Sequence, residues 1–127
     1  MPPKNKFSVL AALWFVLAWY GLMKESSGNP PPFPHFDKVA HCGIFFTQIW
    51  LLARSYIEAS PRLIPYRNLL IFALLFATVS EIAQAWLTRT RSGDPLDALA
   101  DMVGTVFALL LARNVAHNRA TLSDHIA

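Results

Sequence analysis

Three short segments of this chain concentrate side chains able to transfer protons, bind metal ions or bind charged ligands. The segments read DKVAH at residues 37–41, SEIAQ at 80–84 and GDPLDALAD at 93–101. Carboxylates and imidazoles are common groups in general acid–base catalysis, and together they also suit divalent metal ions. Each segment lies near the end of a long apolar run, so the chemistry depends on the elements that place these segments together.

Four apolar runs supply those elements. The chain has 127 residues, of which 54% are hydrophobic and 15% are charged, whereas a soluble domain usually has about 25% charged residues. A helix that crosses the hydrocarbon core of a bilayer needs about 20 apolar residues. We therefore predict an all-α, integral membrane four-helix bundle that forms a single domain over residues 1–127. The expected spans are about 7–23, 38–57, 69–87 and 96–112, with a frayed polar tail at 114–127.

Basic residues predict the orientation of this bundle. If the four runs cross the membrane in turn, seven of the eleven Lys and Arg residues lie on the side of the N-terminus, the second loop and the tail. Cytoplasmic loops carry the excess of Lys and Arg, so both termini are expected in the cytoplasm. The three polar segments then share the outer leaflet.

The first apolar run also has features of a secretory signal peptide. It follows Lys4 and Lys6, which form a short basic region. However, its 17 uncharged residues exceed the usual length of a signal-peptide core, and no clear Ala-x-Ala cleavage site follows. These features favour a retained membrane helix.

Composition argues against two kinds of partner or site. The net charge of +3 is dispersed, without a block of Lys and Arg interleaved with aromatic residues, so we expect no nucleic-acid partner. Cys42 is the only cysteine in the sequence, which allows neither an internal disulfide nor a thiolate zinc site. We expect Cys42 to pack as a small hydrophobic residue within a span.

The third polar segment combines a helix start with an acid that capping does not explain. Asp94 followed by Pro95 is typical of an N-cap and the first helical residue. Asp97 then lies where a carboxylate complements the helix dipole, and it also faces the other acids. Asp101 lies about 10 Å beyond the cap and shares a face with Asp97, so it needs a cation, a proton or a metal ion nearby. Gly104, one turn deeper, would let a neighbouring helix approach closely.

The first polar segment places a cation and an imidazole beside an acid. Asp37 is expected to be the N-cap of the second span. Lys38, just inside that helix, opposes the dipole, so we expect it to have an acidic partner elsewhere. His41 shares a face with both residues. A histidine in an apolar run is usually only hydrogen-bonded, so its structural and functional interpretations both stay open.

The second polar segment puts Glu81 and Gln84 on one face of the third span, about one turn below the outer interface. Ionisable side chains at this depth normally face the protein interior, another charge or water. Glu81 is therefore either a structural partner of Lys38, Arg89 or Arg91, or a proton acceptor or ligand.

Together these segments resemble the signature blocks of the VanZ-like family of small bacterial membrane proteins. That pattern reads roughly D-K-x-x-H, later E-x-x-Q, then R-S followed by D-x-x-x-N-x-x-G. The matched residues are Asp37, Lys38, His41, Glu81, Gln84, Arg91, Ser92, Asp97, Asp101 and Gly104. The resemblance covers about residues 37–112. Phe45 stands where the family often has Tyr, and Asp101 stands where it commonly has Asn.

The resemblance implies a multi-pass protein of the bacterial cytoplasmic (inner) membrane with a role in the cell envelope. It also implies an association with resistance to glycopeptide antibiotics, particularly teicoplanin. We favour a non-enzymatic protein that binds a lipid-linked envelope component, through its polar or anionic headgroup, or a lipophilic glycopeptide. Lys38, Arg89 and Arg91 would then hold the anion. The expected ligand-binding residues are Asp37, Lys38, His41, Glu81, Gln84, Arg91, Ser92, Asp97 and Asp101.

Two alternatives stay open from the residues. The first is a membrane-embedded acid–base or metal-dependent hydrolase or transferase with Glu81, His41 and Asp101 as candidate catalytic residues. We expect no cofactor in the favoured function, although in this alternative the side chains could hold a divalent metal ion. The chain has no recognisable nucleophile motif. The second is a cluster that only locks the helices together or relays protons.

Overall fold

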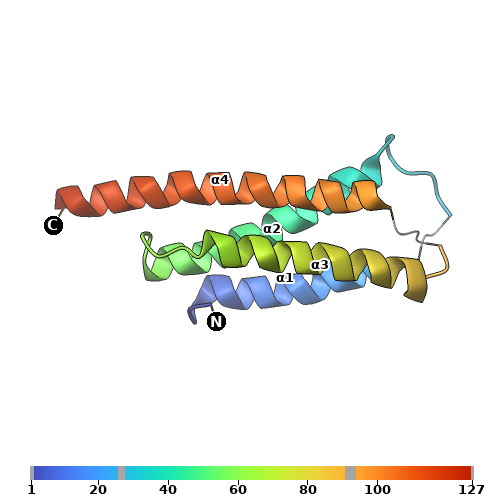
Figure 1. Cartoon of the computed structure of the whole chain (residues 1–127), viewed down its shortest axis with the longest axis horizontal. Coiled ribbons are helices and arrows are strands. Elements are labelled where there is room, and N and C mark those ends of the chain that lie inside the picture. Colours follow the sequence, from blue (N-terminus) through green and yellow to red (C-terminus); the bar gives the residue numbers. More distant parts are fainter. Residues whose placement is uncertain (1, 26–27, 91–93, 127) are drawn as a thin grey trace.

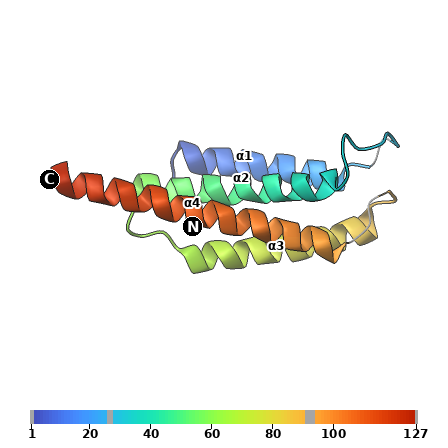
Figure 2. The same ribbon diagram turned by 90° about the horizontal axis from the view of Figure 1, so that it is seen from above.

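The computed structural model describes residues 2–25, 28–90 and 94–126, and these residues form an all-α bundle of four helices. The helices are α1 (Lys6–Met23), α2 (Phe36–Ala59), α3 (Tyr66–Leu87) and α4 (Pro95–Ile126). They lie alongside one another in two views at right angles (Figures 1 and 2). The all-α four-helix prediction is therefore confirmed, and each predicted span lies within one helix.

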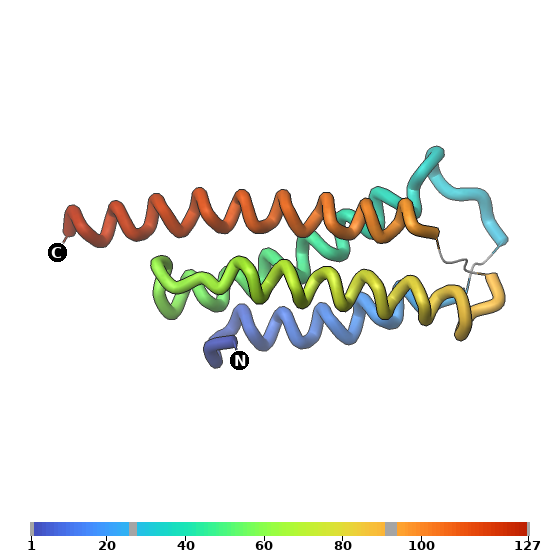
Figure 3. Tube along the Cα trace, in the orientation of Figure 1, coloured from blue at the N-terminus to red at the C-terminus, as the bar shows by residue number. Residues whose placement is uncertain are grey.

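The helices run alternately in opposite directions. Both chain ends and the loop from α2 to α3 lie at one end of the bundle, as the trace in Figure 3 shows. The described parts of the connections from α1 to α2 and from α3 to α4 lie at the opposite end (Figure 1). This arrangement brings the start of α2, the end of α3 and the start of α4 to the same end of the molecule.

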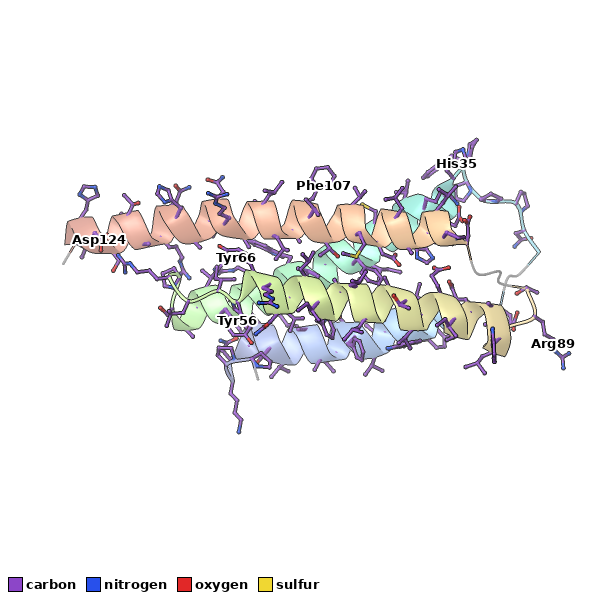
Figure 4. The ribbon with its side chains drawn as sticks, in the orientation of Figure 1. His35, Tyr56, Tyr66, Arg89, Phe107 and Asp124 are labelled. Carbon is purple, nitrogen blue, oxygen red and sulfur yellow. The ribbon has the colours of Figure 1, made fainter. Side chains whose placement is uncertain are left out.

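Three of the helices, α1, α3 and α4, are long and apolar enough to cross a membrane. In α2, polar side chains interrupt the apolar run. Three of them, His41, Gln48 and Ser55, are buried within the bundle. Large apolar side chains such as Val16, Leu75 and Phe107 are instead exposed, and Phe107 points outward from α4 in Figure 4. Apolar residues on the outer faces are typical of helices that contact lipid.

Aromatic residues fill the centre of the bundle. Phe45 of α2 stacks on Phe76 of α3, with 4.7 Å between the ring centroids. Phe15 and Trp19 of α1 pack against the same Phe76 ring, at 4.9 and 5.4 Å. These contacts fix how α2 and α3 are rotated about their axes. Phe45 is fully buried.

Helix α4 packs most extensively along α2, and their backbones come very close at Gly104. A Cβ atom at this position would lie 2.1 Å from the backbone oxygen of Cys42 and 2.9 Å from its carbonyl carbon. Since real side chains do not tolerate such distances, the glycine permits this approach. It brings Asp101, one turn earlier in α4, against α2.

The start of α2 differs from the sequence prediction. Its first residue is Phe36, and the N-cap position is occupied by His35 in the left-handed conformation, with φ 62°. The prediction that Asp37 caps this helix is therefore wrong. Asp37 instead lies in the first turn, where its charge still complements the helix dipole.

The end of α4 also differs from the sequence prediction, because the expected frayed tail is helical to Ile126. The segment after Arg113 contains neither Gly nor Pro to end the helix. Two ion pairs tie it to the α2–α3 region: Arg119 lies 3.1 Å from Glu58, and Arg62 pairs with Asp124.

Candidate functional site

Among the residues that the structure describes, seven ionisable side chains meet at the end of the bundle opposite the termini. The first turns of α2 and α4 and the last turns of α3 supply them, together with the residue before α4. We call this group the acidic cluster; it comprises Asp37, Lys38, His41, Glu81, Asp94, Asp97 and Asp101. Five carboxyl groups thus surround one lysine and one histidine, and the site is strongly acidic.

The buried part of the acidic cluster is a histidine among three carboxyl groups. His41 Nδ1 lies 2.8 Å from Asp101 Oδ1, a hydrogen-bond distance. The same Nδ1 atom is 3.9 Å from Glu81 Oε1, and Nε2 on the other side of the ring is 3.7 Å from Asp97 Oδ2. Asp101 is 0% exposed and His41 3% exposed. The neighbouring helices therefore shield this histidine and its shortest contact from solvent.

Two buried carboxylate oxygens are left without a hydrogen-bond donor among the described residues. They are Glu81 Oε1 and Asp101 Oδ2. Buried polar atoms are normally paired, so such exceptions mark either a functional site or a missing partner. One ligand atom from each of His41, Glu81 and Asp101 lies within 4.8 Å of the others, an arrangement able to hold a metal ion.

The outer part of the acidic cluster is organised around Lys38. Its Nζ atom donates to Asp94 Oδ2 at 3.0 Å and to Asp97 Oδ1 at 3.2 Å. A weaker contact of 3.4 Å joins it to Asp37. An ammonium group has three N–H donors, so all three are engaged by carboxylates. This is the acidic partnership expected for Lys38, and it leaves the ammonium group no free donor for an anion.

Asp94 begins α4 and also joins it to α3. Its Oδ1 atom accepts the Leu96 N–H at 2.9 Å, as an N-cap residue does, and its own N–H donates to Glu81 Oε2 at 2.8 Å. The Leu96 hydrogen bond, followed by the Lys38 contact, holds the pKa of the Asp94 carboxyl below its ordinary value. Glu81 is thus held by Asp94 and approaches His41, instead of pairing with Lys38 or Arg89. The Arg89 side chain points away from the bundle (Figure 4).

Not all of the residues expected in the site lie there. Gln84 is buried, but its Nε2 atom donates to the Leu22 carbonyl of α1 at 2.9 Å. It therefore joins α3 to α1 and is directed away from the acidic cluster. Arg91 and Ser92 lie outside the described residues.

Sequence reasoning missed an apolar groove beside the acidic cluster. This α2–α4 groove has a volume of about 710 Å³. It is lined by His35, Lys38, Val39, Cys42, Gly43, Phe46, Thr47, Leu96, Leu99, Ala100 and Val103. The lining residues are ordinary for a membrane helix, so no sequence signal distinguishes them from residues that simply face lipid.

Sequence reasoning also missed Gln48 and Glu25. Gln48 is buried in the middle of α2 and donates to the Ala11 carbonyl at 3.2 Å, and its position as an uncharged polar residue in an apolar run is a usable signal. Glu25 accepts the backbone N–H groups of Arg89 and Thr90, each at 2.8 Å, which joins the two loops at this end. The Thr90 hydroxyl and these backbone donors lower the pKa of Glu25.

The site as a whole combines two chemical environments. Its buried part can hold a proton or a cation between an imidazole and two carboxylates. Its outer part is a lysine that contacts three carboxylates, beside an apolar groove of about 710 Å³. No family model matches the chain, and the comparisons with curated proteins and with solved structures found no match either.

Proposed function

We propose that the chain is a VanZ-like protein of the bacterial cytoplasmic membrane that binds an amphiphilic component of the cell envelope. The ligand is either a lipid-linked envelope component or a lipophilic glycopeptide such as teicoplanin. Both have an apolar chain attached to a large polar head. The observation that carries this proposal is the α2–α4 groove, which is apolar along most of its length and reaches the acidic cluster at Lys38.

The groove suits the apolar chain of such a ligand. Its volume lies within the range of about 300–1,000 Å³ that is usual for small-molecule sites. Residues such as Leu99 and Val103 offer contacts to an acyl or isoprenoid chain along the surface of α4. An apolar chain held there would place its polar head beside His35 and Lys38.

The charge of the acidic cluster influences which polar head group the amphiphilic ligand would have. The sequence suggested that Lys38, Arg89 and Arg91 would hold an anion, but Lys38 is already engaged by three carboxylates. The surrounding acids favour a head rich in hydroxyl, amide or ammonium donors. Glycopeptides and sugar-bearing lipids have such groups.

Blocking the groove tests this proposal. We expect cells that express the chain to tolerate teicoplanin better than vector controls, and a photoreactive teicoplanin analogue or polyprenyl-linked glycolipid to crosslink to α2 or α4. Val103→Trp should reduce both effects to the control level because the indole fills the groove. Val106→Trp is the matched control: it is similarly exposed, at 46% against 41%, and does not line the groove. Unchanged crosslinking in Val103→Trp, at equal accumulation, would contradict the proposal.

A second candidate function is membrane-embedded acid–base catalysis on a lipid-linked substrate. The observation that favours it is the short His41–Asp101 contact beside a Glu81 oxygen that has no donor among the described residues. In this hypothesis, Glu81 or His41 accepts a proton from the attacking group; where His41 is the base, Asp101 stabilises the resulting imidazolium.

A further inference from the structure

The buried part of the acidic cluster has more negative charge than its surroundings compensate. Glu81 and Asp101 each have one oxygen without a donor in the described part of the chain, and Asp101 is 0% exposed. Asp97, the third carboxylate, is already partnered by Lys38 at 3.2 Å. A proton shared between His41 and Asp101 offsets one charge, but burying a second carboxylate without a cation is costly.

One oxygen of Asp101 and the donor-free oxygen of Glu81 lie close to the imidazole. His41 Nδ1 is 2.8 Å from Asp101 Oδ1 and 3.9 Å from Glu81 Oε1. Two ligands of one tetrahedral metal ion, each about 2.1 Å from the metal, lie about 3.4 Å apart. The His41–Asp101 and His41–Glu81 distances thus bracket the spacing that a metal ion would impose.

From this geometry we propose that His41, Glu81 and Asp101 form a binding site for one divalent transition-metal ion, of which Zn²⁺ fits best and Mn²⁺ is the second choice. One imidazole and two carboxylates provide three ligands and leave positions open for water or another ligand. The two carboxylates neutralise the charge of the ion. The site does not depend on whether the α2–α4 groove binds an amphiphile.

Neighbouring groups already hold these ligands in a suitable orientation. The Asp94 N–H occupies Glu81 Oε2 at 2.8 Å, which leaves Oε1 available to an ion. If a metal ion replaces the proton shared by His41 Nδ1 and Asp101, the ring keeps its proton on Nε2, and Asp97 Oδ2, 3.7 Å from that atom, is a nearby carboxylate that stabilises it there. A carboxylate behind a metal-binding histidine is a common arrangement in metal sites.

Metal titration of the whole protein tests the proposal directly. The detergent-solubilised chain is treated with a chelator, then incubated separately with Zn²⁺, Mn²⁺ and Mg²⁺. We expect one equivalent of Zn²⁺ or Mn²⁺ to remain after gel filtration, and the thermal unfolding midpoint to rise with that ion. A folded protein that retains neither Zn²⁺ nor Mn²⁺ stoichiometrically, whether or not it retains Mg²⁺, would overturn the proposal. This experiment requires no variant.

Amide substitutions then locate the ion. Asp101→Asn and Glu81→Gln should each abolish stoichiometric binding, and Asp97→Asn should weaken it by about 10- to 100-fold. The matched controls are Asp124→Asn and Glu58→Gln, which change exposed carboxylates near the opposite end of the bundle. Both control variants should bind the ion as the wild type does. If Asp101→Asn fails to accumulate, Glu81→Gln still decides, because its amide oxygen can accept the Asp94 N–H. Wild-type affinity in both ligand variants would overturn the assignment.

Discussion

The properties of single residues in the acidic cluster depend on how many partners each one has. Lys38 has three carboxylate contacts, whereas Glu81 and Asp101 each retain an oxygen with no donor among the described residues. The same end of the bundle therefore contains an ammonium group whose N–H donors are all engaged, and carboxylates that each have an oxygen without a donor. Saturated groups stabilise the helix ends, and unsatisfied groups are the ones available for a proton, an ion or a substrate.

Glu81→Gln separates the catalytic hypothesis from simple binding. The amide retains the size of the side chain but cannot act as a general base. If Glu81 transfers a proton, the variant should still accumulate and crosslink to the amphiphile, yet lose antibiotic tolerance. Crosslinking and tolerance are measured in the same cells, with Glu58→Gln as the control. Normal tolerance in Glu81→Gln would exclude Glu81 as the base.

At the scale of helices, the position of α4 against α2 determines the geometry of the acidic cluster. The residues that set it are not the charged ones: Gly104 allows the close approach, and the Phe45–Phe76 contact fixes the rotation of α2 against α3. The position of Asp101 against α2 follows from this packing, because Asp101 lies one turn from Gly104. The small size of Gly104 thus permits the contact between His41 and Asp101.

Gly104→Ala should separate α2 from α4. The added Cβ would lie 2.1 Å from the Cys42 oxygen, a backbone atom that cannot move without its helix. Overpacking of this kind costs about 1–3 kcal/mol, so we expect a lower unfolding midpoint in detergent. Gly43→Ala is the control, because its Cβ would meet nothing within 4 Å, and alanine favours a helix by about 0.5–1 kcal/mol. Equal midpoints for Gly104→Ala and the wild type would show that the helices can move apart freely.

At the scale of the whole molecule, the orientation in the membrane depends on α2. Its length and its place in the bundle favour a fourth span, although only α1, α3 and α4 are apolar enough to cross a membrane by composition. Its buried residues His41, Gln48 and Ser55 are shielded by the other helices. We therefore expect α2 to cross the membrane within the assembled bundle, which would place both termini on one side; the excess of Lys and Arg there predicts that this side is the cytoplasm.

Cysteine labelling distinguishes three spans from four. In a Cys42→Ser background, Asn29→Cys should react with a membrane-impermeant maleimide in intact cells, because the α1–α2 loop is expected outside. Thr121→Cys, near the end of α4, should react only after lysis if α2 crosses the membrane. If α2 does not cross, the end of α4 lies on the outer side, and Thr121→Cys reacts in intact cells.

Local sequence patterns are enough to predict the helices and the end of the bundle at which the polar residues gather. Apolar runs of suitable length predict helices without knowledge of their neighbours, and Asp94 with Pro95 marks the start of α4 through local backbone chemistry. The same local rules were insufficient at Asp37, because the neighbouring His35 adopts a left-handed conformation and begins the helix earlier. They were also insufficient after residue 112, where ion pairs to the α2–α3 region accompany a longer α4.

Which polar groups meet depends on how the helices pack against one another. Gln84 shares a helix face with Glu81 in the sequence, yet it donates to Leu22 of α1. Asp101 lies against His41, whereas Lys38 takes Asp94 and Asp97. These pairings depend on the rotation and separation of whole helices, which are set by packing between residues far apart in the chain. For the same reason, the α2–α4 groove has no signal in either helix alone.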